Sequence, residues 1–142
     1  MDLKGVLGIE RVSFPNPWSP NMFEALHQVN PEGFYVAQIH EDIVAYGIVL
    51  VESTSNRFFK KRRAHLMNLA VHPLLRNQGI GNYLLQTIIS NLKNSKIGEI
   101  YLEVRVSNKY AIHFYKKSGF IENGIIKGFY GDEDAKMMAK KI

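Results

Sequence analysis

The amino-acid sequence predicts an α+β protein built on one mixed sheet. Its 142 residues fit a single domain with one core. A strand at His65–Val71, a helix that starts near Gly79 and a strand at Gly98–Asn108 follow one another, an order that gives two parallel strands joined by a crossover helix. The other expected strands are joined by short turns and so form antiparallel hairpins. We therefore expect residues 1–142 to form one domain.

Composition narrows the class of protein further. Hydrophobic residues make up 46% of the chain and charged residues 22%, which is ordinary for a globular protein. No apolar run is long enough to span a bilayer, and the first residues, "MDLKGVLGIE", lack the pattern of an export signal. We expect a cytoplasmic protein.

The absence of cysteine excludes several kinds of chemistry. A chain without cysteine has no disulfides, no thiolate metal site and no cysteine acyl-enzyme. The five histidines form no H-x-x-x-H pair, so no metal is expected. The net charge of +5 favours an anionic ligand or substrate without by itself implying nucleic acid.

Prolines mark the start of the first expected helix. The segment Ser13–Pro20, "SFPNPWSP", carries three prolines. Ser19 suits the N-cap position and Pro20 suits the first helical position, where its missing N–H is not needed. The helix continues through "NMFEALHQV" and ends near Asn30.

Three strands are expected next. Gly33–Ser53 reads as two strands around a tight turn at His40–Asp42. "SNRFFKKRRA" follows, with five basic residues among the seven positions of Arg57–Arg63, and is expected to be an exposed loop. His65–Val71 is the third strand, ended by His72 and Pro73.

Helical spacing and caps define the rest of the chain. The helix near Gly79 places its apolar residues on one face: Ile80, Leu84, Leu85, Ile88, Ile89 and Leu92. The strand Gly98–Asn108 alternates apolar and polar side chains. Asn108 caps a helix that ends at Gly119, and two final strands flank Gly131–Glu133.

The turn "RNQGIG" raises a chemical question, because two glycines stand where a helix begins. The first amides of a helix lack internal partners and carry partial positive charge, so a phosphate binds there when no side chain blocks it. Gly79 and Gly81 leave that approach open, and Arg76 adds a charged donor. Alternatively, the glycines only relieve a tight connection. Leu84 occupies the third glycine position of a dinucleotide fingerprint, and the lysine of a P-loop is absent.

At this point the sequence resembles the GNAT superfamily of acetyl-CoA-dependent N-acetyltransferases. "RNQGIG" after the strand "LMNLAV" fits that family's pyrophosphate turn. "YLEVRVSNKYAIHFYKKSGF", "NPWSPNMFEAL" and "KGFYGDEDAKMM" are similar to the branch of ribosomal-protein alanine and archaeal N-terminal (N-alpha) acetyltransferases. The resemblance covers Ser13–Met138.

The resemblance implies a GNAT-like sheet, mostly antiparallel, with a central splayed parallel strand pair that admits the pantetheine arm of acetyl-CoA, flanked by about four helices. Main-chain groups of Leu69 and Val71 would pair with the pantetheine amides, and an amide at Leu69 or Ala70 would polarise the thioester carbonyl. Asn108 and Tyr115 would lie near the cofactor's arm. The pyrophosphate would be held by Arg76, Asn77, Gln78, Gly79, Ile80 and Gly81.

The implied reaction is direct acetyl transfer to the N-terminal α-amine of a protein. Such amines have pKa values of ~7.7–8.0, against ~10.4 for lysine, so a weak base suffices. Glu103 matches the family's base, although a strand glutamate paired with Arg105 or a lysine is the alternative. Tyr115 matches the acid that protonates the CoA thiolate, although a core tyrosine packed with Ile112 is the alternative.

Two segments are implied to recognise the acceptor, a protein or peptide N-terminus and among others a ribosomal protein. The first is the loop with Phe14, Pro17 and Trp18, in which Trp18 alternatively only anchors the neighbouring helix. The second is the final hairpin with Phe129 and Tyr130. Phe129 stands where many relatives have a second tyrosine, so the preferred N-terminal residue stays open.

Two rival functions remain at this stage. The first is an acetyltransferase for lysine side chains, polyamines or another small amine. The second is a CoA- or RNA-binding module without turnover, which would use the basic segment Arg57–Arg63. Membrane binding is not expected. His72 and His113 are interpreted as a turn residue and a solvated helix residue.

Overall fold

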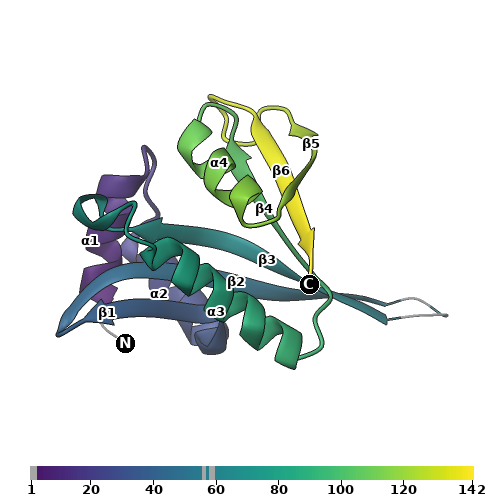
Figure 1. The fold of residues 1–142 in the computed structure, drawn as a ribbon, viewed down its shortest axis with the longest axis horizontal. Helices are drawn as coiled ribbons and strands as arrows, with labels where there is room; N and C mark the ends of the chain where they lie inside the picture. Colours follow the sequence, from purple (N-terminus) through teal and green to yellow (C-terminus); the bar gives the residue numbers. More distant parts are fainter. Residues whose placement is uncertain (1–2, 56, 58–59) are drawn as a thin grey trace. The chain divides into compact units, whose positions relative to one another are not determined.

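The computed structural model describes residues 3–55, 57 and 60–142. The described part contains four α-helices and six strands, and the strands form one sheet in the order β1-β2-β3-β4-β6-β5 (Figure 1). In chain order the elements are α1 (Leu3–Ser13), α2 (Pro20–Val29), the 3-10 turn η1 (Pro31–Gly33), β1 (Phe34–Ile39), β2 (Asp42–Ser55), β3 (Lys60–Val71), η2 (Pro73–Leu75), α3 (Ile80–Asn94), β4 (Glu99–Arg105), α4 (Lys109–Lys117), β5 (Ile121–Ile126) and β6 (Ala135–Lys141).

The sheet is mixed and mostly antiparallel, as the sequence predicts. β1 pairs with β2, β4 with β6 and β5 with β6, all antiparallel. β3 and β4 are parallel, with Ala64 opposite Ile100 and His65 opposite Tyr101. The crossover between them contains α3, so the order of elements around the glycine turn predicted this parallel pair correctly.

The chain divides into two compact units. The first comprises Met1–Leu50 and Met67–Asn91, and the second comprises Val51–Leu66 and Leu92–Ile142. β2 and β3 therefore each contribute one end to each unit.

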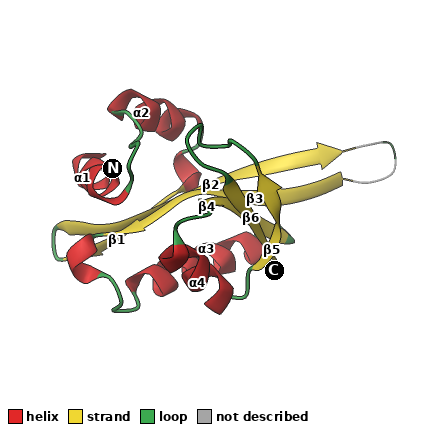
Figure 2. Ribbon diagram, turned by 90° about the horizontal axis from the view of Figure 1, so that it is seen from above, coloured by secondary structure: helices red, strands yellow, loops and turns green. Residues whose placement is uncertain are grey.

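The first unit has a helix layer on either side of its strands. Figure 2 shows α1 and α2 on one side of β1 and β2, and α3 on the other. Its core joins these helices to the strands through Val6, Ile9, Phe23, Tyr46, Ile48 and Ala70. The N-cap expected for α2 is present, because the Ser19 hydroxyl accepts the Met22 amide at 3.3 Å and Pro20 begins the helix.

α1 was missed by the sequence analysis, which assigned no helix before Ser13. Two glycines, at positions 5 and 8, lower the helix propensity of this segment. Gly5 is required by packing, since a Cβ atom there would lie 2.9 Å from Cβ of Ile43. Tertiary contact with β2 thus outweighs a poor local preference.

The second unit packs α4 on β4, β6 and β5. The buried side chains come from β4 and β6, from the inner face of α4 and from the connection after this helix: Ile100, Leu102, Val104, Ile112, Tyr115, Phe120, Ala135 and Met138. Asn108 caps α4 by accepting the Ala111 amide at 3.1 Å. Gly119 follows the helix with φ of 93°, the left-handed conformation expected of a C′ glycine.

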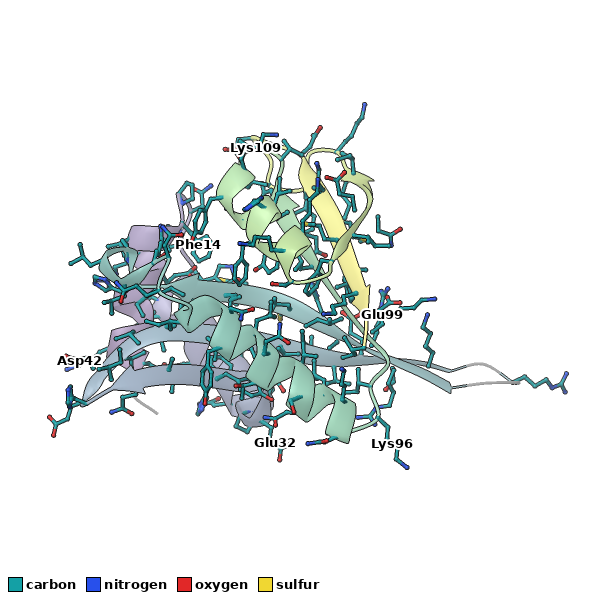
Figure 3. All side chains as sticks on the ribbon, viewed as in Figure 1. Phe14, Glu32, Asp42, Lys96, Glu99 and Lys109 are labelled. Carbon is teal, nitrogen blue, oxygen red and sulfur yellow. The ribbon has the colours of Figure 1, made fainter. Side chains whose placement is uncertain are left out.

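The basic segment is strand rather than loop over much of its length. β2 runs to Ser55 and β3 begins at Lys60, so the prediction of an exposed loop through Arg63 is wrong for the residues after position 59. Phe58 and Phe59 lie outside the described residues. Side chains alternate in a hairpin, so charged residues can project while the backbone stays paired. Lys61 lies 3.9 Å from Glu99, whose position at the start of β4 is marked in Figure 3.

Candidate functional site

The glycine turn in the first unit lies directly before α3. Asn77 and Gly79 both have positive φ, 63° and 86°. The first hydrogen bond of the helix runs from the Tyr83 amide to the Gly79 carbonyl at 2.9 Å. The amides just before Tyr83 belong to the first turn, whose N–H groups have no partner within a helix. A Cβ atom at Gly79 would meet no atom within 4 Å, so space is open there. The positive φ explains the glycine, and the open space leaves room for an anion.

Arg76 anchors this turn. Its Nε donates to the Val71 carbonyl at 3.1 Å, and its Nη2 donates to the Ser13 hydroxyl at 3.1 Å. The arginine therefore ties the end of β3 and the end of α1 to the turn, a structural role that the sequence did not predict.

The end of β3 presents a buried side chain between two partly exposed ones. Ala70 packs in the core of the first unit, while Leu69 and Val71 are half-buried. Strand alternation sends the side chains of Leu69 and Val71 to the opposite face from Ala70. His72 follows the strand and caps η2, since its Nδ1 accepts the Leu74 amide at 3.2 Å. The interpretation of His72 as a turn residue is confirmed.

A buried carboxylate holds the proline-rich loop, and the sequence analysis missed it. Among the described residues, Glu10 is a charged residue that is fully buried, with 1% of its surface exposed. It accepts the Trp18 amide at 2.9 Å, the Asn68 side-chain amide at 3.1 Å and the Tyr46 hydroxyl. Burial and the bond to Glu10 raise the pKa of Tyr46 above its usual range. The only sequence signal was a single acidic residue among the apolar positions of "VLGIERV".

The aromatic residues of the loop pack on the first unit. Trp18 lies against Phe23 of α2, with ring centroids 5.5 Å apart, so Trp18 anchors the loop to this helix. Phe14 packs against the same core, at the place where the loop leaves α1 (Figure 3). Pro17 is exposed.

Glu103 and His65 form a close polar pair in the second unit. His65 Nε2 lies 2.5 Å from Glu103 Oε2, and both side chains are largely covered, with 19% and 12% exposed. β4 brings them together because it runs parallel to β3, with Tyr101 opposite His65. Arg105, the partner considered for Glu103, instead binds Asp132 at 3.0 Å and Glu133 at 3.3 Å. The ion-pair alternative with Arg105 is therefore wrong. His65 was missed because a lone histidine in a strand carries no motif.

Tyr130 lies near this pair. The Arg105 guanidinium sits 4.3 Å from the centre of the Tyr130 ring. Burial and the nearby Glu103 carboxylate raise the pKa of Tyr130 to about 12, so the phenol stays neutral. Phe129 packs edge-on against Tyr130 at 4.9 Å and is 47% exposed. The loop before β6 is fixed by the Ser107 amide, which donates to Glu133 at 2.7 Å.

Tyr115 is buried on the inner face of α4. Its ring lies edge-on to Phe120, with centroids 5.4 Å apart, and the residue is 8% exposed. Burial, and then the neighbouring Tyr130, raise the pKa of Tyr115 above its usual range. The core packing considered for this tyrosine is present. Asn108 stands at the start of the same helix, next to Lys109, which Figure 3 marks, and His113 is exposed as expected.

Two further features bear on function. Across residues 3–55, 57 and 60–142, no group of three or more His, Asp or Glu side chains could hold a metal ion. No helix in the same described part is long and apolar enough to cross a membrane.

Comparison with known proteins adds a family and several relatives. The model of the "Acetyltransferase (GNAT) family" matches residues 3–120. The chain is 34% identical to an N-alpha-acetyltransferase of Sulfurisphaera tokodaii over 99% of this chain and 88% of that one. It is 33% identical to the [ribosomal protein bS18]-alanine N-acetyltransferase of Escherichia coli over 99% and 92%.

A solved structure extends this similarity to three dimensions. Arabidopsis thaliana Naa50, in complex with the bisubstrate analogue CoA-Ac-MVNAL, superposes with a TM-score of 0.84 at 26% identity. The match covers 99% of this chain and 93% of that chain, so it includes the elements of both units.

Proposed function

The chain belongs to the acetyltransferase (GNAT) family, and from this premise we propose that it transfers the acetyl group of acetyl-CoA to the N-terminal α-amine of proteins by direct nucleophilic attack. The observation that carries this function is the Glu103–His65 pair, a proton acceptor in a largely covered site beside Tyr130. An α-amine has a pKa of ~7.7–8.0, so an appreciable fraction is already neutral at neutral pH, and a weak base suffices to accept the proton released on attack.

Glu103 acts as the general base in this proposal. The acceptor amine attacks the acetyl carbonyl, a nitrogen–carbon bond forms, and the carbon–sulfur bond of the thioester breaks. The proton lost by the amine goes to the Glu103 carboxylate, directly or through a water molecule. The 2.5 Å contact with His65 supports the role because it fixes the orientation of the carboxylate.

Tyr115 acts as the general acid. Its pKa is raised by burial, so the phenol keeps its proton at neutral pH. The thiol of CoA has a pKa near ~8.5. Tyr115 therefore donates its proton to the sulfur while the carbon–sulfur bond breaks, not afterwards, and then regains a proton from water. The net reaction returns both side chains to their starting states.

The acetyl-CoA site uses main-chain groups of the first unit. The strand end Leu69, Ala70 and Val71 would hold the pantetheine and polarise the carbonyl. The open space at Gly79 supports a pyrophosphate site at the helix start. Asn108 and Tyr115 would contact the arm of the cofactor. The turn residues assigned to the pyrophosphate are Arg76, Asn77, Gln78, Gly79, Ile80 and Gly81.

Acceptor recognition is assigned to two aromatic segments. The loop with Phe14, Pro17 and Trp18 is held by Glu10, which supports a fixed contact surface. Tyr130, kept neutral by its raised pKa, would hydrogen-bond the peptide backbone, with the exposed Phe129 beside it. The Escherichia coli relative acts on a ribosomal protein, so we include ribosomal proteins among the acceptors. We place the activity in the cytoplasm and assign residues 1–142 to one N-acetyltransferase domain, which the family match over residues 3–120 supports.

A peptide panel tests this function. The protein is incubated with acetyl-CoA and peptides that differ in the first residue, and the acetylated atom is mapped by mass spectrometry. We expect acetyl groups on α-amines, with lysine side chains in the same peptides unmodified. Modification confined to lysine or to polyamines would instead support a small-amine acetyltransferase, and CoA binding without thiol release would support a non-catalytic module.

A further inference from the structure

His65 lies between two carboxylates in the second unit. On one side its Nε2 contacts Glu103 at 2.5 Å, and on the other its Nδ1 lies 3.5 Å from Glu52 Oε1. Glu52 is on β2, His65 on β3 and Glu103 on β4, so three strands contribute one residue each. The imidazole therefore links the proposed base to a second carboxylate that is 32% exposed.

Glu52 is held in this place by two neighbours. The Tyr101 hydroxyl donates to its carboxylate, 2.7 Å from each oxygen, and Arg63 Nε lies 3.3 Å from Oε2. The Tyr101 ring also stacks on His65, with centroids 4.4 Å apart and planes 11° from parallel. The Arg63 guanidinium lies 4.2 Å from the centre of the same ring. Tyr101 thus fixes both the histidine ring and the carboxylate behind it.

The geometry of the group fixes the imidazole ring between two carboxylates. A nitrogen–oxygen contact of 2.5 Å needs a hydrogen between the atoms, so a hydrogen bond joins His65 Nε2 to Glu103. The other ring nitrogen, Nδ1, faces Glu52 at 3.5 Å. Partial burial works to raise the pKa of Glu52, but the Tyr101 hydrogen bond, His65 and Arg63 outweigh it and lower that pKa, so Glu52 is ionised at neutral pH.

We propose that Glu52 is a positioning residue for acetyl transfer, which acts through His65 by holding the imidazole, with its proton, against Glu103. This role deepens the function proposed above and rests on Glu103 being the base. By holding the ring, Glu52 keeps the Glu103 carboxylate in one orientation, so that it is placed to receive the amine proton. After transfer Glu103 returns this proton to water, and His65 keeps its own.

The other titratable groups around His65 are accounted for. Arg63 on β3 opposes the charge of Glu52, and Tyr101 on β4 stays neutral because burial and Glu52 raise its pKa. Tyr130 and Arg105 lie on the far side of Glu103, where the Tyr130 phenol is neutral and Arg105 is bound to two carboxylates. Glu52 is therefore the group whose neutralisation changes the field at His65 without removing the base.

The test is the split between kcat and KM in Glu52→Gln. The variant removes the charge and keeps the size of the side chain. We expect kcat to fall by roughly threefold to tenfold, because a carboxylate that is less well oriented accepts the amine proton less readily. The KM for acetyl-CoA should stay unchanged.

Glu99→Gln is the matched control. Glu99 begins β4 and pairs with Lys61 at 3.9 Å, so its neutralisation removes one carboxylate charge of the same sheet outside the cluster. We expect its kcat to equal that of the unaltered protein. An unchanged kcat in Glu52→Gln would overturn the proposal. Tyr101→Phe removes the hydroxyl contact of Glu52 and retains the ring, so its kcat should fall less. This variant serves if Glu52→Gln does not fold.

A readout without turnover separates this proposal from the function. The ring N–H of His65 that faces Glu103 is followed by NMR in the protein alone and assigned by its loss in His65→Gln. Its resonance should be present in the unaltered protein and weakened or shifted in Glu52→Gln, because the ring is no longer held against Glu103. An unchanged resonance refutes the role of Glu52 whatever the substrate is. A changed resonance in a protein that acetylates no α-amine refutes the proposed function alone.

Discussion

Tyr115 shows how one side chain is both packed and suited to proton transfer. Its ring contacts Phe120, and the burial that stabilises the ring also raises the pKa of its hydroxyl. A phenol with a raised pKa is protonated across the neutral range, so its proton is present there, although the same burial makes the phenol a weaker acid. Packing therefore sets the protonation state of Tyr115, and its role as the acid is a prediction.

Tyr115→Phe keeps the ring and removes only the hydroxyl. We expect kcat to fall by roughly a hundredfold, the lower end of general acid catalysis, with little change in melting temperature. Thiol release measures the rate. Tyr110→Phe, on the exposed face of the same helix, is the control and should retain the rate. Full turnover by Tyr115→Phe would remove the assignment of the acid.

Glu10 matters at the residue scale because three donors depend on it. The Trp18 amide, the Asn68 amide and the Tyr46 hydroxyl all donate to one buried carboxylate. Removal of the carboxylate leaves the Trp18 amide and the Tyr46 hydroxyl without this acceptor, at about 1–3 kcal/mol per group, while the Asn68 amide keeps its contact with the Tyr46 hydroxyl at 3.4 Å.

Glu10→Ala should accordingly lower the free energy of unfolding by at least about 2 kcal/mol, measured by urea denaturation. Glu24→Ala, on the exposed face of α2, tests whether loss of any helical glutamate is enough, and it should change stability little. Equal effects of the two substitutions would show that the buried network is not needed for stability.

At the scale of elements, the start of α3 combines a backbone requirement with open space. Gly79 has φ of 86°, and nothing lies within 4 Å of the position its Cβ would take. Gly124 in β5 provides a matched case, with φ of 111° and the same open surroundings. Alanine should have a similar conformational cost at both positions, but only Gly79 lies in the turn assigned to the pyrophosphate.

Gly79→Ala and Gly124→Ala should each lose about 1–2 kcal/mol of stability, the cost of a left-handed alanine. Only Gly79→Ala should weaken acetyl-CoA binding, because the strained turn no longer aligns its amides. A loss of about 1.4 kcal/mol, similar to the conformational cost of the alanine, corresponds to about tenfold in affinity. Calorimetry with acetyl-CoA measures this. Equal affinities in both variants would mean that the turn does not hold the pyrophosphate.

At the scale of the whole molecule, ionised carboxylates link stability to pH. Hydrogen bonds from Lys116 and Lys136 lower the pKa of Glu122 to about 2. Arg105 lowers the pKa of Asp132, and the Ser107 amide lowers that of Glu133. A depressed pKa in the folded state contributes stability above the unfolded value, near ~4.3 for glutamate, which is lost as pH falls through the folded value.

Stability should therefore decline as pH falls from about 5 towards 2, followed by circular dichroism during acid titration. In Glu122→Gln the decline should be shallower at its acidic end, because the contribution is already absent at neutral pH. Glu41→Gln, in the exposed turn between β1 and β2, should leave the curve unchanged. A steeper acidic end in Glu122→Gln would contradict the sign.

Local features of the fold followed from the sequence because their causes lie within a few residues. Ser19 and Asn108 cap their helices, Gly119 ends α4, and the spacing around the glycine turn predicted the parallel pair. Each depends on backbone geometry or on side chains one turn apart. The family's sequence motifs, including the turn Arg76–Gly81, were visible for the same reason.

Only the tertiary structure decided which side chains meet. His65 and Glu103 are 38 positions apart, and Glu10 and Asn68 are 58 apart, so no local pattern signals either contact. Packing also made a helix of α1 despite its glycines and extended β3 through basic residues. The sequence by itself determined the family and most of the elements, with α1 and the start of β3 as the exceptions, because propensity and motif act locally. The partner of each buried or reactive carboxylate depends on strand register. Register is set by the pairing of strands that are far apart in the sequence.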